Sequence, residues 1–242
     1  MKTCLSPLSK TLFVAVLILF LLLYGCASIP VEQQREADLN LSLGLSYLKE
    51  GNYQAAYIQF QTAHRLEPKN KNILHCLGIV YLHFENLEKS KKYLLEAISI
   101  DDNFSEAHNN LGIVYMKKAQ WNEAIAHFKK ALSNPLYQNP ESAYFNLSIA
   151  YYRLENYELA ITTLREAVKR APNFAPLYYR LALCYNKMGR YGEASEMLTT
   201  AIEKDPSYNG DEIKFIQEIK KQYLSSDQQD PDLVDYLKIA NY

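Results

Sequence analysis

The sequence lacks the short motifs on which most enzyme active sites depend. Its 242 residues contain no HExxH pair, no glycine-rich phosphate loop and no GxSxG nucleophile turn. The five histidines are scattered, and no two of them stand at a His-x-x-x-His spacing. We therefore predict a protein that is not an enzyme and that uses no cofactor, no metal and no small-molecule substrate.

The chain also lacks an excess of charge of one sign. It has 26 basic and 27 acidic residues, a formal net charge of −1 and no basic block, which argues against nucleic-acid binding. Four cysteines, Cys4, Cys26, Cys76 and Cys184, show neither a CxxC motif nor metal-binding spacing. We expect Cys76 and Cys184 to be small buried thiols that form no disulfide bond.

The apolar run near the N-terminus, residues 12–23, is too short for a membrane-spanning helix, which needs about 20 residues. It follows Lys2 and Lys10 and ends in Gly25 and Cys26. A basic start, a short apolar stretch and small residues at its end are typical of a secretory signal. An uncleaved signal anchor and a plainly secreted protein are the alternatives.

The end of this run, Leu23-Tyr24-Gly25-Cys26, resembles a bacterial lipoprotein signal. The resemblance implies a signal peptide over residues 1–25, cleavage before Cys26 and lipid attachment to the Cys26 thiol. Ala27, where an inner-membrane lipoprotein of enteric bacteria carries Asp, implies anchoring at the periplasmic face of the outer membrane. Residues 26–35 would then form a short lipidated tether.

One pattern, a leucine, a small residue and then a tyrosine, recurs five times after the signal. The leading leucines lie at positions 43, 77, 111, 147 and 181, which are 34, 34, 36 and 34 residues apart. This period and residue order resemble the tetratricopeptide repeat, a helix–turn–helix unit that stacks into a solenoid. We therefore predict an all-α solenoid of about five repeats over residues 36–208, followed by a capping helix and tail over residues 209–242. The capping helix is expected over residues 211–223, and the tail ends in a short final helix over residues 232–242, whose docking the sequence does not predict.

The small residue after each leucine predicts a close approach between the two helices of a repeat. It is Gly44, Gly78, Gly112, Ser148 or Ala182, and the second helix carries Ala or Ser as a matching flat position. The segment between repeats three and four, residues 134–140, is two residues longer than the period allows. Its two prolines and two asparagines predict an ordered kink rather than another helical turn.

The first helices of tetratricopeptide solenoids line a concave groove with the fifth, ninth and twelfth positions of each repeat. The ninth position is aliphatic in all five repeats, which favours a groove for a helix or an extended segment of another protein. The alternative is that these side chains only pack neighbouring helices. The predicted groove residues are Leu41, Leu45, Leu48, His75, Ile79, Leu82, Asn109, Ile113, Met116, Phe145, Ile149, Tyr152, Tyr179, Leu183 and Asn186. The leucine end and the aromatic end of this row are equally plausible binding sites.

The stretch over residues 134–146, NPLYQNPESAYFN, resembles a linker in the type IV pilus pilotin lipoproteins of the PilF/PilW/Tgl family. In that family a (D/N)P-x-Y-x-x-P-E-x-A-x-x-N stretch joins successive repeats, and residues 40–56 also resemble its first repeat. The resemblance implies an outer-membrane lipoprotein that binds subunits of the pilus secretin and helps them assemble. A periplasmic adapter that recruits envelope proteases or peptidoglycan enzymes is the alternative.

Overall fold

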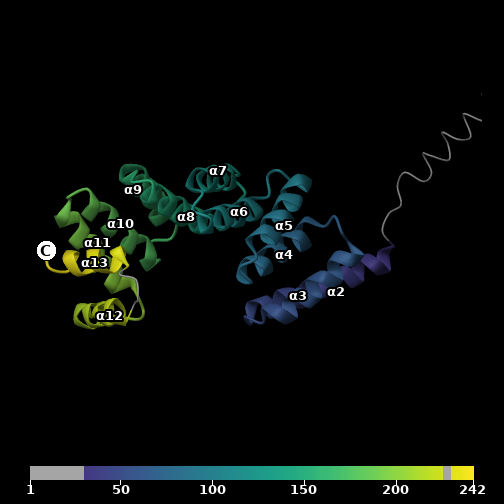
Figure 1. The fold of residues 1–242 in the computed structure, drawn as a ribbon, viewed down its shortest axis with the longest axis horizontal. Coiled ribbons are helices and arrows are strands. Elements are labelled where there is room, and N and C mark those ends of the chain that lie inside the picture. Colours follow the sequence, from purple (N-terminus) through teal and green to yellow (C-terminus); the bar gives the residue numbers. More distant parts are fainter. Residues whose placement is uncertain (1–29, 226–229) are drawn as a thin grey trace, which may run out of the picture. The chain divides into compact units, whose positions relative to one another are not determined.

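A computed structural model describes residues 30–225 and 230–242. These residues form twelve helices, α2 to α13, and no strand (Figure 1), so the predicted all-α fold is confirmed. None of these helices is both long enough and apolar enough to cross a membrane. The predicted signal peptide and Cys26 lie outside the described residues.

The chain divides into two compact units, and the first ends at Pro68. Its described part is one helical hairpin, α2 (Val31–Lys49) and α3 (Tyr53–Leu66), which corresponds to the first predicted repeat. Helix α2 begins inside the stretch expected as a tether. The Gln33 side chain explains this extra turn, because its Nε2 donates a hydrogen bond to the carbonyl of Leu66 at the end of α3 (2.8 Å).

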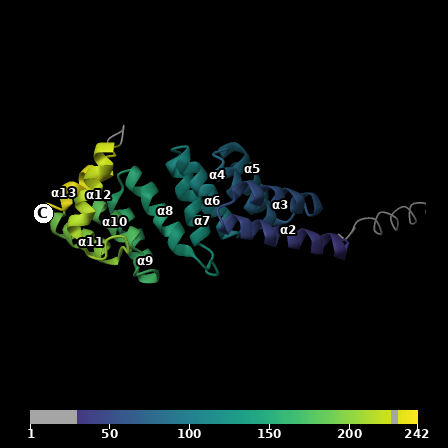
Figure 2. The same ribbon diagram turned by 90° about the horizontal axis from the view of Figure 1, so that it is seen from below.

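The second unit, residues 69–242, contains the other four repeats as four successive hairpins and ends in two further helices. Each hairpin packs against the next in sequence order (Figure 2). Its helices are α4 (Lys71–His83), α5 (Leu87–Ile100), α6 (Ser105–Lys117), α7 (Trp121–Leu132), α8 (Pro140–Arg153), α9 (Tyr157–Arg170), α10 (Ala175–Lys187), α11 (Tyr191–Lys204), α12 (Glu212–Ser225) and α13 (Pro231–Ile239).

The turn inside each repeat has the same backbone geometry. One residue adopts the left-handed conformation, with φ between 54° and 76°, and the next backbone N–H donates to the carbonyl of the repeat tyrosine at 2.8–2.9 Å. This closure satisfies carbonyls that the end of the first helix leaves free. The left-handed residues are Gly51, Glu85, Ala119, Glu155 and Gly189, at the same intervals as the leading leucines.

The close approach predicted from the small residues is present in the three repeats that carry glycine. A Cβ added to Gly112 would lie 2.5 Å from Cε1 of Phe128, and one added to Gly44 would lie 2.4 Å from Cε1 of Phe60. Both rings are fully buried. The flat position on the second helix is also as expected. Ser90, which replaces alanine in repeat two, is buried and donates its Oγ–H to the carbonyl of Gly78 (2.7 Å).

The predicted kink between repeats three and four is confirmed. Residues 133–139 are not helical, and two bonds centred on Asn134 order them. Its Oδ1 accepts the backbone N–H of Leu136 (3.0 Å), and its Nδ2 donates to the carbonyl of Asn103 (3.0 Å). Pro140 then opens α8, where a proline loses no helical hydrogen bond.

The two helices after the repeats form the C-terminal end of the second unit (Figure 2). Both were predicted from sequence, α12 as a cap and α13 as a short final helix whose docking was not predicted. In the structure α13 packs on α10, α11 and α12, and its Ile239 is fully buried. The apolar core of the last two repeats therefore continues into α13.

Candidate protein-binding surface

The predicted groove residues fall into two groups, because the chain has two units. Leu41, Leu45 and Leu48 lie on α2 in the first unit, where Leu45 keeps 46% of its surface exposed and the other two are partly buried. The other twelve lie on the first helices of the second unit, α4, α6, α8 and α10. That any of them binds a partner stays a prediction.

The fifth and sixth positions of neighbouring first helices pair through polar side chains. Asn110 on α6 donates its Nδ2 to Nε2 of His75 on α4 (2.7 Å), and Asn146 on α8 donates its Nδ2 to Oδ1 of Asn109 on α6 (3.2 Å). Burial lowers the pKa of His75 to about 4, so the ring is neutral and can accept this bond. These positions fix the register between repeats.

The pattern changes at the last repeat. The sixth position of repeat five is Arg180 on α10, and the fifth position of repeat four is Phe145 on α8, which offers no polar acceptor. The guanidinium of Arg180 instead lies over the ring of Tyr152, with Cζ 5.3 Å from the ring centroid. It forms an ion pair with Asp232 on α13, with Nη1 3.0 Å from Oδ2. Sequence reasoning did not identify Arg180.

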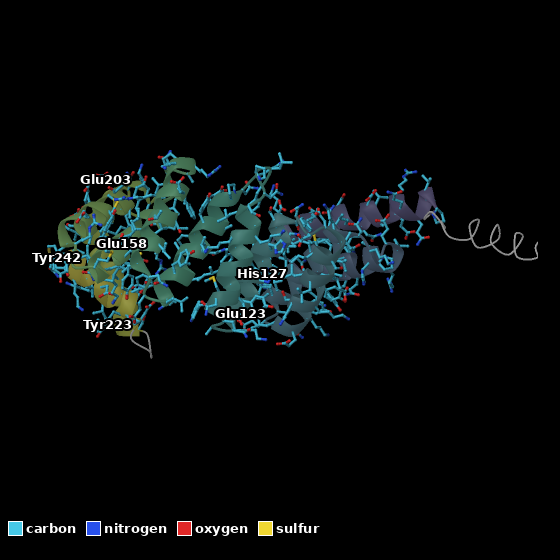
Figure 3. The ribbon with its side chains drawn as sticks, turned by 90° about the horizontal axis from the view of Figure 1, so that it is seen from above. Glu123, His127, Glu158, Glu203, Tyr223 and Tyr242 are labelled. Carbon is cyan, nitrogen blue, oxygen red and sulfur yellow. The ribbon has the colours of Figure 1, made fainter. Side chains whose placement is uncertain are left out.

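A second ion pair lies one turn further along α13. Lys187 near the end of α10 places its Nζ 2.6 Å from Oδ2 of Asp235, whose side chain is only 6% exposed. This contact raises the pKa of Lys187 above its usual value, so the ammonium form is favoured. Tyr242 donates its O–H to Oδ1 of Asn186 (2.9 Å), and Figure 3 marks that tyrosine at the C-terminus.

Helix α13 therefore contacts the aromatic end of the predicted groove. Tyr152 is buried and donates its O–H to Oδ1 of Asp232 (3.4 Å). The ring of Tyr179 meets that of Tyr236 edge-on at 5.7 Å between centroids, and Leu183 is fully buried in the apolar cluster that includes Ile239. We name this surface, formed by Tyr152, Tyr179, Arg180, Leu183, Asn186 and Lys187, the α13 seat.

A cavity of about 310 Å³ lies beside the α13 seat. Tyr179 and Arg180 line it from α10, Phe145 lines it from α8, Phe215 and Ile219 line it from α12, and Leu233 and Tyr236 line it from α13. Helices α12 and α13 thus leave space between themselves and helices α8 and α10. Burial raises the pKa of Tyr179 and of Tyr236, which keeps both phenols protonated.

The described residues contain two buried thiols and no cluster of metal-ligating side chains. In the part of the chain that the structure describes, no group of three or more metal-ligating side chains comes together. Cys76 and Cys184 are buried and free, as expected, and burial raises the pKa of each thiol to about 12. Such thiols are poor nucleophiles at neutral pH.

Sequence profiles of the tetratricopeptide repeat match residues 37–70, 73–104, 103–173 and 151–211. Together they cover every predicted repeat and well over half of the chain. The chain belongs to the tetratricopeptide repeat family. Members of this family are typically non-enzymatic scaffolds that bind protein partners.

The curated relatives of this tetratricopeptide repeat protein are diverse. An uncharacterized protein of Haemophilus influenzae is 25% identical over 182 residues, which cover 73% of this chain and 99% of that protein. A BBSome complex member BBS4 homolog of Drosophila melanogaster is 25% identical over 196 residues. This chain spans 40% of that homolog and 32% of the Bos taurus BBSome complex member BBS4.

Solved structures similar to this tetratricopeptide repeat protein include PilW, a type IV pilus biogenesis factor, with a TM-score of 0.69 and 19% identity. The match covers 85% of this chain and 98% of PilW. PilF of Pseudomonas aeruginosa also gives a TM-score of 0.69, at 16% identity, with 87% of this chain and 99% of PilF covered. These likenesses show the fold.

Proposed function

We propose that this protein is an assembly factor for type IV pili, which binds subunits of the pilus secretin and helps them to assemble in the outer membrane. The observation that carries the proposal is that the structural matches with PilW, a type IV pilus biogenesis factor, and with PilF cover most of this chain and nearly all of the other chain. The solved structure of MamA matches less of this chain (79%) at a lower TM-score of 0.59.

The segment before α8 gives independent support. Its residues match the pilotin linker pattern, and the structure gives two of them a physical role. Asn134 orders the joint through its bonds to Leu136 and Asn103, and Asn146 pairs α8 with α6 through Asn109. The resemblance therefore includes residues that determine how successive repeats are joined.

Lipid attachment at Cys26 is part of the same proposal. Two or three acyl chains hold a protein stably on a bilayer, where a single chain is marginal. A lipid anchor and a binding surface in one molecule would raise the effective concentration of bound secretin subunits at the outer membrane. The protein would thus act by localisation and recognition, without catalysis.

The test is secretin assembly in a strain that lacks this gene. We expect detergent-resistant secretin multimers to disappear from the outer-membrane fraction and to return with the wild-type gene. Cys26→Ser should leave the protein folded but release it from membranes, so multimers should not be restored. Unchanged multimers in the deletion strain would refute the proposal. Recovery of an envelope protease or a peptidoglycan enzyme with the protein, in place of secretin, would support the adapter alternative.

Two substitutions test the proposal that the partner binds in the groove. Ile113 on α6 and Ile149 on α8, the ninth positions of repeats three and four, are partly buried in the structure. We expect Ile113→Asp and Ile149→Asp to weaken secretin recovery while the helix content measured by circular dichroism is kept. Equal loss of helix content would show that both residues belong to the core.

A further inference from the structure

The contact face of α13 has the spacing of a helical ligand. Asp232, Asp235, Tyr236 and Ile239 stand at positions i, i+3, i+4 and i+7 and so share one side of the helix. All four contact the rest of the second unit, the two aspartates through ion pairs and the two others through the apolar cluster. Anchors at this spacing are how a short helix is recognised in a groove.

The α13 seat also has charges that the repeats themselves do not use. Arg180 occupies the position at which the two preceding repeats carry asparagines that pair between first helices. The partner of Arg180 comes instead from α13. Arg180 keeps only 15% of its side chain exposed beneath α13, and covering a cation without a carboxylate is strongly unfavourable, so any helix that covers the seat must carry an acidic residue there.

The fit between α13 and its seat is incomplete. The Nε of Arg180 is buried without a hydrogen-bond partner among the described residues, and Nη1 alone contacts Asp232. Arginine binds a carboxylate most strongly through two parallel N–H bonds. The cavity of about 310 Å³ beside Arg180 is a second sign that a better ligand can be accommodated.

We propose that the α13 seat is the binding site for an acidic amphipathic helix of a protein partner, and that α13 occupies it as a replaceable internal ligand. The partner helix carries carboxylates at positions i and i+3 and apolar or aromatic residues at i+4 and i+7. It displaces α13, binds Arg180 through two N–H bonds and places a bulkier side chain against Phe145 and Tyr179, walls of the cavity that remain when α13 leaves. The inference rests on the proposed function in that the partner is a protein segment.

Competition between the two helices sets the observed affinity. A partner binds only the fraction of molecules whose seat is free, so its apparent affinity falls in proportion to that fraction. Substitutions that weaken α13 without touching the seat should therefore tighten partner binding. Substitutions in the seat should abolish it.

The experiment uses full-length protein and a fluorescent peptide with the sequence of residues 230–242 as the probe, measured by fluorescence anisotropy. We expect the variant Asp232→Ala/Asp235→Ala to bind this peptide at least about ten-fold more tightly than the wild type. Adding Arg180→Ala and Lys187→Ala to that variant should remove binding. A peptide with both aspartates changed to asparagine should not bind. Glu203→Ala, at an exposed acidic position of α11 (Figure 3), is the matched control and should behave as the wild type.

Equal peptide affinity in the wild type and in the Asp232→Ala/Asp235→Ala variant would overturn the proposal, provided that circular dichroism shows both to be folded. A dimeric wild type whose α13 helices are exchanged would also overturn it, because the occupant would then be a second copy. The peptide assay contains no secretin. If deletion of the gene leaves the secretin multimers unchanged while the peptide binds as expected, only the proposed function is refuted. If the multimers disappear but the peptide does not bind as expected, only the α13 seat is refuted.

Discussion

The contact between Gly112 and Phe128 allows one prediction to be worked out in numbers. An alanine at position 112 would place its Cβ 2.5 Å from Cε1, 2.7 Å from Cδ1 and 2.8 Å from Cζ of Phe128. The ring is fully buried and cannot swing into solvent. Overpacking of this kind costs about 1–3 kcal/mol, and the better helix propensity of alanine returns about 1 kcal/mol. With three ring atoms this close, we expect Gly112→Ala to lose a net of about 1–2 kcal/mol of unfolding free energy.

A matched control lies on α11. A Cβ added to Gly192 would meet no atom within 4 Å, so Gly192→Ala should be neutral or gain up to about 1 kcal/mol. Repeat five supplies a rescue, because it carries Ala182 and Leu198 at the positions of Gly112 and Phe128. We expect Phe128→Leu to recover part of the loss caused by Gly112→Ala, since the smaller side chain leaves room for the new methyl group.

The measurement is urea unfolding followed by far-ultraviolet circular dichroism, with the three variants and the wild type compared at one protein concentration. The predicted order of stability is Gly192→Ala at or above the wild type, then Gly112→Ala with Phe128→Leu, then Gly112→Ala alone. If Gly112→Ala were as stable as Gly192→Ala, the close approach would not be what selects glycine at this position. The reasoning would then fail for Gly44 and Gly78 as well.

Three further predictions concern buried groups. The pKa of His75 falls from an ordinary 6.5 to about 4 on folding, so the unfolded chain takes up the proton first and stability falls as the pH drops below 6.5. The part of this loss due to His75 should be about 2 kcal/mol between pH 7 and pH 5, measured by urea unfolding as the difference between the wild type and His75→Gln, in which glutamine can still accept a bond from Asn110. Burial lowers the pKa of His127 as well, so His75→Gln should keep a pH dependence. In a variant whose other two cysteines are serine, Cys76 and Cys184 should react with an aromatic disulfide reagent only when the protein unfolds. Fast reaction of the native protein would contradict their burial. Ser90→Ala should change the free energy of unfolding by less than about 1 kcal/mol, because the higher helix propensity of alanine offsets the lost hydrogen bond. A larger destabilisation in thermal unfolding would mean that this bond is needed to hold the two helices of the hairpin together.

The repeats could be predicted because each depends on residues close together in sequence. The leucine, small residue and tyrosine of a first helix, and the alanine of the second, lie within one hairpin. Their spacing therefore reports directly on which faces meet. The joint over residues 133–139 was predictable for the same reason, since its prolines and the bond between Asn134 and Leu136 lie within the segment, whereas the bond from Asn134 to the distant Asn103 could not be predicted.

The docking of α13 could not be predicted in this way. Its periodicity indicates an apolar face but not the surface that this face covers. The partners that decide the docking lie far away in sequence: Tyr152 is 80 residues and Arg180 is 52 residues from Asp232. A signal was present in Arg180, the only basic residue at the sixth position of any repeat. The two asparagine pairs in the structure show that the sixth position joins neighbouring first helices, which the sequence alone did not indicate.

The joint between α7 and α8 also indicates where a chain of tetratricopeptide repeats can gain or lose residues. Its two additional residues fall between hairpins, so the left-handed turn of each hairpin keeps the same hydrogen bonds on both sides of it. Leu136 within the joint keeps 84% of its surface exposed. Insertions are tolerated where backbone is exposed and makes few contacts. The joint is therefore the natural place to attach a reporter group, and a place where related arrays can gain or lose residues without disturbing any hairpin.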